Sequence, residues 1–169
     1  MDILDVIKKE HRQVAGMLDR AEKCDPGDKE LLDLTRQIEQ ALSTHVKIEE
    51  RLFYSRLREG AEEEKQLVDV YEAYTEHDVA DHLLQLLKSG RKPDEKFKAE
   101  MQVLGESVKH HVREEESTVF AIARKVIDPE EREGLGEKWA KARQRLDAQA
   151  ARGGRGSSSR RKTPAKVSR

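Results

Sequence analysis

The chain has 169 residues, a length that suits one domain. Charged residues make up 40% of it and aromatic residues only 4%, which favours a highly solvated all-α protein over a sheet protein. The formal net charge is −1, but residues 152–169 hold seven Lys or Arg and no acid. The rest of the chain therefore carries −8 by subtraction, so we consider the two parts separately.

The cysteine content and the lack of long apolar runs bear on the cellular compartment. Cys24 is the only cysteine, so the chain cannot form an internal disulfide, which fits a reducing environment. The first residues show no signal pattern, and no stretch reaches the roughly 18 apolar residues that span a bilayer. We expect a cytoplasmic protein with no membrane partner.

Apolar residues at helical spacing predict four long helices and one short one. The long helices are expected at about residues 3–23, from the turn at 25–28 to 58, 62–88, and from Pro93 to 127. Their connections are short, which favours an antiparallel up-down-up-down four-helix bundle. Asp128 and Pro129 start a short fifth helix, in which Gly134 and Gly136 weaken the first turns. The prediction is a bundle domain at 1–150 and a disordered basic tail at 151–169.

Four histidines recur at steps of 34, 32 and 34 residues: His11, His45, His77 and His111. Each lies on the apolar face of its predicted helix, in the series of core positions at alternating steps of three and four residues that we call the seam. Antiparallel helices with a rise of about 1.5 Å per residue would bring all four to a similar depth. The seam also carries three carboxylates, at Glu49, Asp81 and Glu115.

Such a set is costly to bury without a cation. Unpaired carboxylates are expensive in a core and repel one another, so these groups either hydrogen-bond mutually or bind metal. A single histidine on an apolar face is more often an ordinary core residue, but four at one level with two His-x-x-x-Glu pairs favour a metal site. Mixed nitrogen and oxygen ligands favour iron, with manganese as second choice, over structural zinc or an iron–sulfur cluster.

Several ligand assignments stay open at this point. His110 competes with His111, because an error of one residue in the seam would exchange them. In the third helix either Asp81 or His82 could add a ligand, and the four-residue spacing from His77 favours Asp81. Two tyrosines offer lesser alternatives: Tyr54 as a phenolate ligand and Tyr74, mainly a packing residue, as a hydrogen-bond donor to a ligand. Glu50, next to Glu49, is interpreted as a surface charge.

These segments resemble the hemerythrin-like (HHE cation-binding) domain family. The resemblance covers about residues 2–150 and rests on the segments DILDVIKKEHRQV, HVKIEERLFY, YTEHDVADHLL and VKHHVREEESTVF. It implies two non-haem iron ions with an oxo or hydroxo bridge. The implied ligands are His11, His45, Glu49, His77, His111 and Glu115, with both glutamates bridging.

The third helix departs from the oxygen-carrying members of that family. Those members have two histidines four residues apart there, whereas Asp81 follows His77 at that spacing in this chain. A site poorer in nitrogen favours redox activity over reversible oxygen binding. We therefore expect a catalase-like activity toward peroxide, or a reaction with dioxygen or nitric oxide, in oxidative stress. The alternative is an iron, oxygen or redox sensor, or a metal-binding module, without turnover, so enzymatic activity stays open.

The basic tail offers a separate hypothesis. Its Lys and Arg residues could attract nucleic acid electrostatically, but it lacks the aromatic residues that stack on bases. We expect a solubilising tail, and no nucleic-acid binding elsewhere in the chain. The oligomeric state is not predicted.

Overall fold

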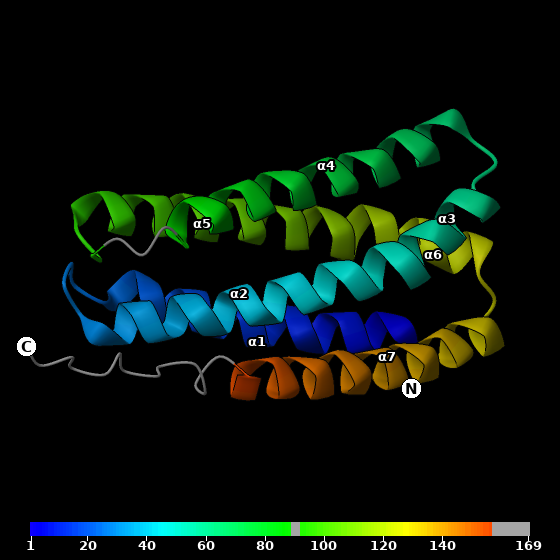
Figure 1. The fold of residues 1–169 in the computed structure, drawn as a ribbon. Coiled ribbons are helices and arrows are strands. Elements are labelled where there is room, and N and C mark those ends of the chain that lie inside the picture. Colours follow the sequence, from blue (N-terminus) through cyan, green and yellow to red (C-terminus); the bar gives the residue numbers. More distant parts are fainter. Residues whose placement is uncertain (89–91, 157–169) are drawn as a thin grey trace, which may run out of the picture.

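The computed structural model describes residues 1–88 and 92–156, and within these ranges its regular structure is helical. Four long helices run antiparallel to their chain neighbours, which confirms the predicted all-α bundle (Figure 1). They are α1 (Ile3–Lys23), α2 (Lys29–Glu49), α4 (Glu64–Leu87) and α5 (Glu95–Glu114). Asp2 and Asp94 cap α1 and α5 through side-chain bonds from the backbone N–H groups of Leu4 and Phe97.

Helices α2 and α5 each continue through one π-helical segment into a short α-helix. The segments are η1 (Glu50–Tyr54) leading into α3 (Ser55–Gly60), and η2 (Glu115–Val119) leading into α6 (Phe120–Val126). A π-helical turn holds an extra residue, so it rotates the following side chains relative to a regular α-helix. Tyr54 and Phe120 therefore become fully buried, while Leu52 and Thr118 are only partly buried. In a regular helix Leu52 and Thr118, three residues after Glu49 and Glu115, would share the buried face of those glutamates.

The fifth helix, α7 (Pro129–Gly156), is not short as predicted but 28 residues long. It packs against α1, α2 and η1, on the side of the bundle away from α4 and α5 (Figure 1). The helix continues through Gly136, where glycine is required because the backbone carbonyl of Met1 occupies the space that a Cβ would need. The helix also extends through the predicted start of the tail at 151, and residues 157–169 lie outside the described residues.

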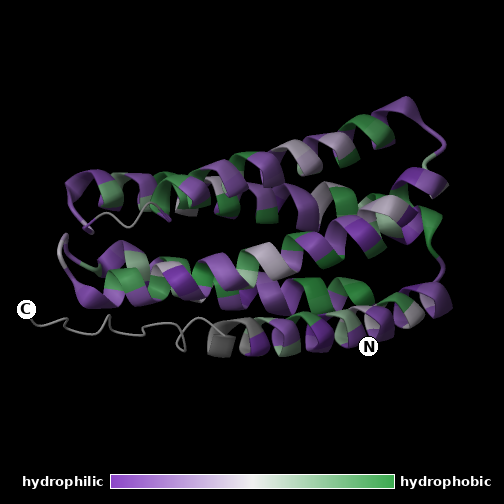
Figure 2. Ribbon diagram, viewed as in Figure 1, coloured by the Kyte–Doolittle hydropathy of each residue, from purple (hydrophilic) through white to green (hydrophobic). Residues whose placement is uncertain are grey.

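Hydrophobic and hydrophilic residues alternate along every helix of the bundle (Figure 2). The buried hydrophobic residues form two separate clusters. One joins the start of α1 to η1, α3, α6 and α7 and includes Phe53, Phe120 and Trp139. The other fills the opposite end and includes Leu34, Phe97 and Met101. The predicted ligands lie between these clusters, where apolar packing from both ends limits the access of water. No described helix is long and apolar enough to span a membrane.

Candidate metal centre

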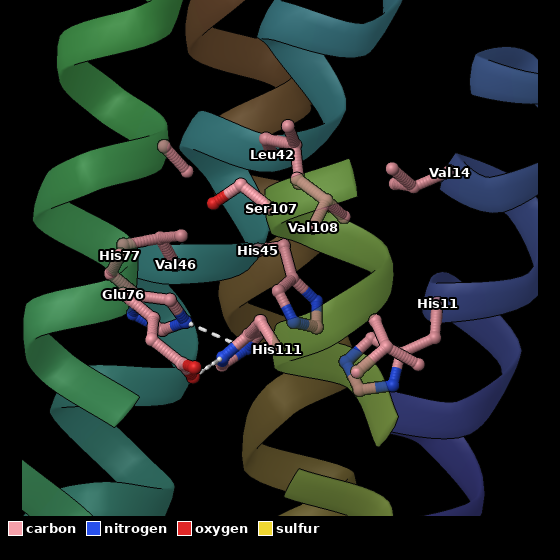
Figure 3. A pocket seen from close by; sticks show the side chains of 12 residues that line it. His11, Val14, Leu42, His45, Val46, Glu76, His77, Ser107, Val108 and His111 are labelled. Carbon is pink, nitrogen blue, oxygen red and sulfur yellow. Dashed lines mark hydrogen bonds and ion pairs between the residues drawn. The ribbon is translucent and has the colours of Figure 1, made fainter. Parts of the chain in front are cut away.

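Four buried histidines, one from each long helix, converge between the two apolar clusters (Figure 3). The ring centroids of His11 and His45 are 5.1 Å apart, and those of His77 and His111 are 4.7 Å apart. The Nε2 atoms of His77 and His111 lie 3.2 Å from each other. The predicted common depth is therefore observed, and the imidazoles form two neighbouring pairs.

Two carboxylates, each 0% exposed, link these pairs. The Oε2 atom of Glu49 lies 3.1 Å from Nε2 of His45 and 3.3 Å from Nε2 of His77. The Oε2 atom of Glu115 lies 3.2 Å from Nε2 of His11 and 3.7 Å from Nε2 of His111. Each glutamate thus contacts one histidine of either pair, as a carboxylate that bridges two metal ions must.

The hydrogen bonding of these atoms is incomplete in a way that fits metal ions. Among the described residues, both carboxylate oxygens of Glu49, Oε2 of Glu115 and Nε2 of His11 and His45 are buried without a hydrogen-bond partner. Buried polar atoms almost always have partners, and these five face only one another and His77 around one point, which suits metal ions. Three overlapping groups have ligand atoms within 4.8 Å of one another: His11/His111/Glu115, His11/His45/Glu49 and Glu49/His77/His111.

Four outer glutamates orient the histidines through their Nδ1 atoms. The distances from Nδ1 to the carboxylate oxygen are 3.0 Å for His11 with Glu116, 2.9 Å for His45 with Glu10, 3.0 Å for His77 with Glu50 and 2.8 Å for His111 with Glu76. A carboxylate on Nδ1 fixes the ring and the tautomer that directs the Nε2 lone pair toward a metal. Our sequence reasoning missed this role, and it interpreted Glu50 as a surface charge.

An internal repeat could have revealed these glutamates. The second half of the bundle repeats the first at an offset of 66 residues, which pairs Glu10 with Glu76, His11 with His77, His45 with His111, Glu49 with Glu115 and Glu50 with Glu116. The contacts repeat as well, because Glu10 binds His45 as Glu76 binds His111. The centre is thus built from two equivalent helical hairpins.

Two features break this equivalence. Tyr54 donates a hydrogen bond of 2.9 Å to Oε1 of Glu115, whereas its counterpart Phe120 has no hydroxyl to offer Glu49. Helix α7 packs mainly on the first repeat, where Trp139 and Arg143 donate to Glu10.

The carboxylates change the protonation of the metal-free histidines. Burial alone would lower the pKa of His45, but the charge of Glu49 and the hydrogen bond with Glu10 outweigh it and raise the pKa to about 10. Burial is outweighed in the same way at His77, where Glu49 and Glu50 raise the pKa to about 9. Burial would favour neutral Glu49, yet His45 holds the pKa of that carboxyl well below its usual value. Protons thus balance the carboxylates when metal is absent.

The residues considered as further ligands lie outside this centre. Asp81 is exposed and accepts a hydrogen bond from Gln85, so its predicted place in the buried seam is wrong. His82 is exposed too. The His110 side chain is 56% exposed and contacts Glu76, so the structure favours His111 over it in the centre.

Neither Tyr54 nor Tyr74 takes the ligand-related role considered for it from the sequence. Burial first, and then the charges of Glu115 and Glu49, raise the pKa of Tyr54 well above its usual value, which keeps it a neutral donor and not a phenolate. Tyr74 donates to the backbone carbonyl of Glu50 and not to a histidine.

A small cavity borders the histidines on the side away from η1 and η2. Its volume is about 20 Å³. The four histidines and Glu76 share its wall with Ser107 and with apolar side chains that include Val14, Leu42 and Val108 (Figure 3). A space of this size holds about one water molecule, so only a very small molecule fits beside the centre.

The chain is similar to two known proteins, one in sequence and one in fold. A DNA nickase from Nostoc sp. is 31% identical over 162 residues, which are 91% of this chain and 44% of that protein. The chain thus spans less than half the length of this relative. A hemerythrin HHE cation binding domain-containing protein from Mycobacterium kansasii has a crystal structure that matches with a TM-score of 0.77. That match covers 89% of this chain and 90% of the other, and at 22% identity it supports the fold alone.

The family comparison covers the four helices that carry the centre. The sequence model of the hemerythrin HHE cation binding domain matches residues 2–123, so the match ends within α6 and α7 lies outside it. The buried histidine and glutamate groups of the centre are able to bind metal, in agreement with a cation-binding domain. The chain therefore belongs to the hemerythrin HHE cation-binding domain family.

Proposed function

We propose that this chain holds two iron ions and uses them to disproportionate hydrogen peroxide into oxygen and water. The observation that carries the proposal is the set of five buried imidazole and carboxylate atoms without hydrogen-bond partners, which surround one point. Imidazole and carboxylate ligands together suit iron, and two carboxylates that each contact both histidine pairs suit a pair of ions.

The proposed ligands divide between two metal positions. His11 and His45 would hold one ion, His77 and His111 would hold the other, and Glu49 and Glu115 would bridge them. Six side chains do not fill the coordination shells of two such ions, so positions stay open for water or substrate. When bound, the ions supply Lewis acidity and redox equivalents.

The protein's own residues orient the centre and limit its access. Glu10, Glu50, Glu76 and Glu116 hold the Nδ1 protons and keep each Nε2 atom directed inward. Tyr54 holds Glu115 in place through its hydroxyl proton. The cavity of about 20 Å³ beside the histidines suits molecules of the size of water, dioxygen, nitric oxide or peroxide.

Iron counting combined with peroxide turnover tests the proposal. The purified chain is reconstituted with ferrous iron without oxygen, iron per chain is counted, and oxygen release is followed after peroxide is added. Two irons per chain with rapid oxygen release support the proposal, and a chain that retains no iron refutes it. The matched variant is Glu49→Gln, which keeps the side-chain size and removes the charge that bridges the histidine pairs.

A sensor or storage module is the alternative that this experiment distinguishes. Such a protein would bind two irons and change its optical spectrum with peroxide or nitric oxide, yet release no oxygen over many equivalents. The enclosed cavity supports this alternative equally, because both roles need access for small molecules only.

DNA nicking is a second candidate, favoured by the name of the Nostoc relative that matches 91% of this chain. The buried centre argues against direct attack on a phosphodiester, since its histidines and bridging glutamates have almost no exposed surface. Nicking of supercoiled plasmid by the iron-loaded chain, lost in Glu49→Gln, would support this candidate. If the iron-loaded chain does not nick the plasmid, the nicking activity of the relative must depend on the part of that protein that this chain lacks.

A further inference from the structure

A groove between α4 and the η2 end of α5 leads from the surface to the candidate metal centre. It has a volume of about 220 Å³. Its charged lining comprises one ammonium, Lys65, and five carboxylates: Asp69, Glu72, Glu76, Glu114 and Glu115. Lys65 is paired with Asp69 at 2.8 Å, and Glu76 and Glu115 contact histidines of the centre. Glu72 and Glu114 therefore supply the negative field at the outer part of the groove.

The corresponding place in the first repeat is apolar and covered. At the 66-residue offset, Asp69 corresponds to Ile3, Glu72 to Val6, Glu114 to Ile48 and Thr118 to Leu52. These four apolar residues belong to the cluster that packs with Leu135 and Trp139 of α7. One repeat is thus sealed by the fifth helix, whereas the other presents carboxylates to solvent at equivalent positions.

Other surface grooves beside the centre do not share this charge. The groove between α2 and α4, which reaches His77, has three carboxylates (Glu50, Asp78 and Asp81) and two ammonium groups (Lys47 and Lys88). The groove beside α7 has Glu10 balanced by Arg143. A cleft lined by charges of one sign concentrates counter-ions, so among these three grooves the α4–η2 groove suits cations best.

The inner end of the groove supplies an independent sign of a cation. Glu115 lines the groove and is 0% exposed, and its Oε2 atom has no hydrogen-bond partner among the described residues. Glu72 and Glu114, in contrast, are exposed at the outer part. Carboxylates therefore continue from solvent to a bridging ligand of the proposed centre.

The structure assigns this groove as the entry route for divalent metal ions: hydrated cations collect at Glu72 and Glu114 and pass to Glu115. The assignment rests on the metal binding in the proposed function, but not on peroxide turnover. The outer carboxylates capture the cation electrostatically, and the buried one exchanges its water for protein ligands.

Metal uptake by the metal-free chain tests the route. Cobalt(II) is mixed with protein in a stopped-flow instrument at low ionic strength, and its absorption reports the rate and the final stoichiometry. Glu72→Gln combined with Glu114→Gln should slow uptake on the order of tenfold and leave the stoichiometry unchanged. The difference should vanish in about 1 M salt, where the screening length is only about 3 Å.

Two comparisons make the test specific. Asp78→Asn combined with Asp81→Asn removes the same charge from the α2–α4 groove and should leave the rate unchanged. Thr118→Leu introduces the residue of the sealed repeat and should slow uptake even at high salt, because it obstructs without changing charge. Equal rates for wild type and Glu72→Gln/Glu114→Gln at low salt would overturn the route. If instead the proposed enzymatic function is wrong, the chain loads metal at the normal rate but releases no oxygen from peroxide.

Discussion

Replacement of Tyr54 by phenylalanine should destabilise the metal-free protein through one hydrogen bond. The Tyr54 side chain is 0% exposed, and its hydroxyl donates to Oε1 of Glu115 at 2.9 Å. A hydrogen bond to a charged group contributes about 1.5–3 kcal/mol, and the unpaired carboxylate left behind keeps its full desolvation cost. The Oε2 atom of Glu115 faces Nε2 of His11 at 3.2 Å, so the substitution leaves Oε1 as the oxygen that loses its donor.

We expect the free energy of unfolding to fall by about 2–3 kcal/mol in Tyr54→Phe. For a chain of this size that corresponds to a decrease in Tm of roughly 4–12 °C. Urea denaturation of the metal-free protein, followed by far-ultraviolet circular dichroism, should show a lower midpoint with an unchanged m-value. An unchanged m-value would show that the folded state, and not the compactness of the unfolded chain, is affected.

Tyr74→Phe is the matched control, because it removes the same atom from a nearby tyrosine. Tyr74 donates to the neutral backbone carbonyl of Glu50 at 3.2 Å, so its loss should cost only about 0.5–1.5 kcal/mol. If Tyr54→Phe costs no more than Tyr74→Phe, the argument from a buried charged acceptor is refuted.

Three further predictions concern the metal. His45→Ala should abolish iron binding, whereas His110→Ala should keep most of it, as iron per chain would show; equal retention would mean that the centre uses other ligands. Metal uptake near neutral pH should release protons, because His45 and His77 have raised pKa values of about 10 and 9. Calorimetry in buffers of different ionisation enthalpy measures this release, and uptake without proton release would contradict protonated imidazoles. The raised values also mean that these imidazoles stabilise the metal-free fold fully below their ordinary pKa of 6.5 and lose that contribution as the pH rises to about 10. Urea midpoints across this range should therefore fall for the metal-free protein more than for the loaded one, and parallel curves would contradict the assignment.

The apolar seam predicts the buried residues correctly where a regular α-helix continues. It predicts them wrongly where the order of three- and four-residue steps or the helix type changes. In α4 the buried series includes Ala73, His77, Ala80 and Leu84, so the step after His77 is three residues and not four. Asp81 was placed in the core by choosing the four-residue step, which is equally compatible with an α-helix. Because alanine is small and only weakly apolar, the sequence around position 80 does not distinguish the two.

The π-helical segments explain a second group of errors. A regular helix continued beyond Glu49 places Leu52 in the core and Tyr54 off the seam, whereas the extra residue in η1 leaves Leu52 partly buried and buries Tyr54. No residue pattern in this segment indicates a π-turn beforehand, because it depends on how Glu49 is held at the centre. The role of Tyr54 as a donor to Glu115 therefore emerges only from the structure.

The fifth helix determines how the two equivalent hairpins come to differ. Each hairpin contributes the same residue types, at the same spacing, to the centre. Helix α7 then fixes Glu10 between Trp139 and Arg143, whereas Glu76, its counterpart, lines both the small cavity and the acidic groove. The repeat thus supplies equivalent ligands from both hairpins, as the proposed pair of metal ions requires. The asymmetric cover leaves the acidic groove, our proposed route for cations, on the second hairpin.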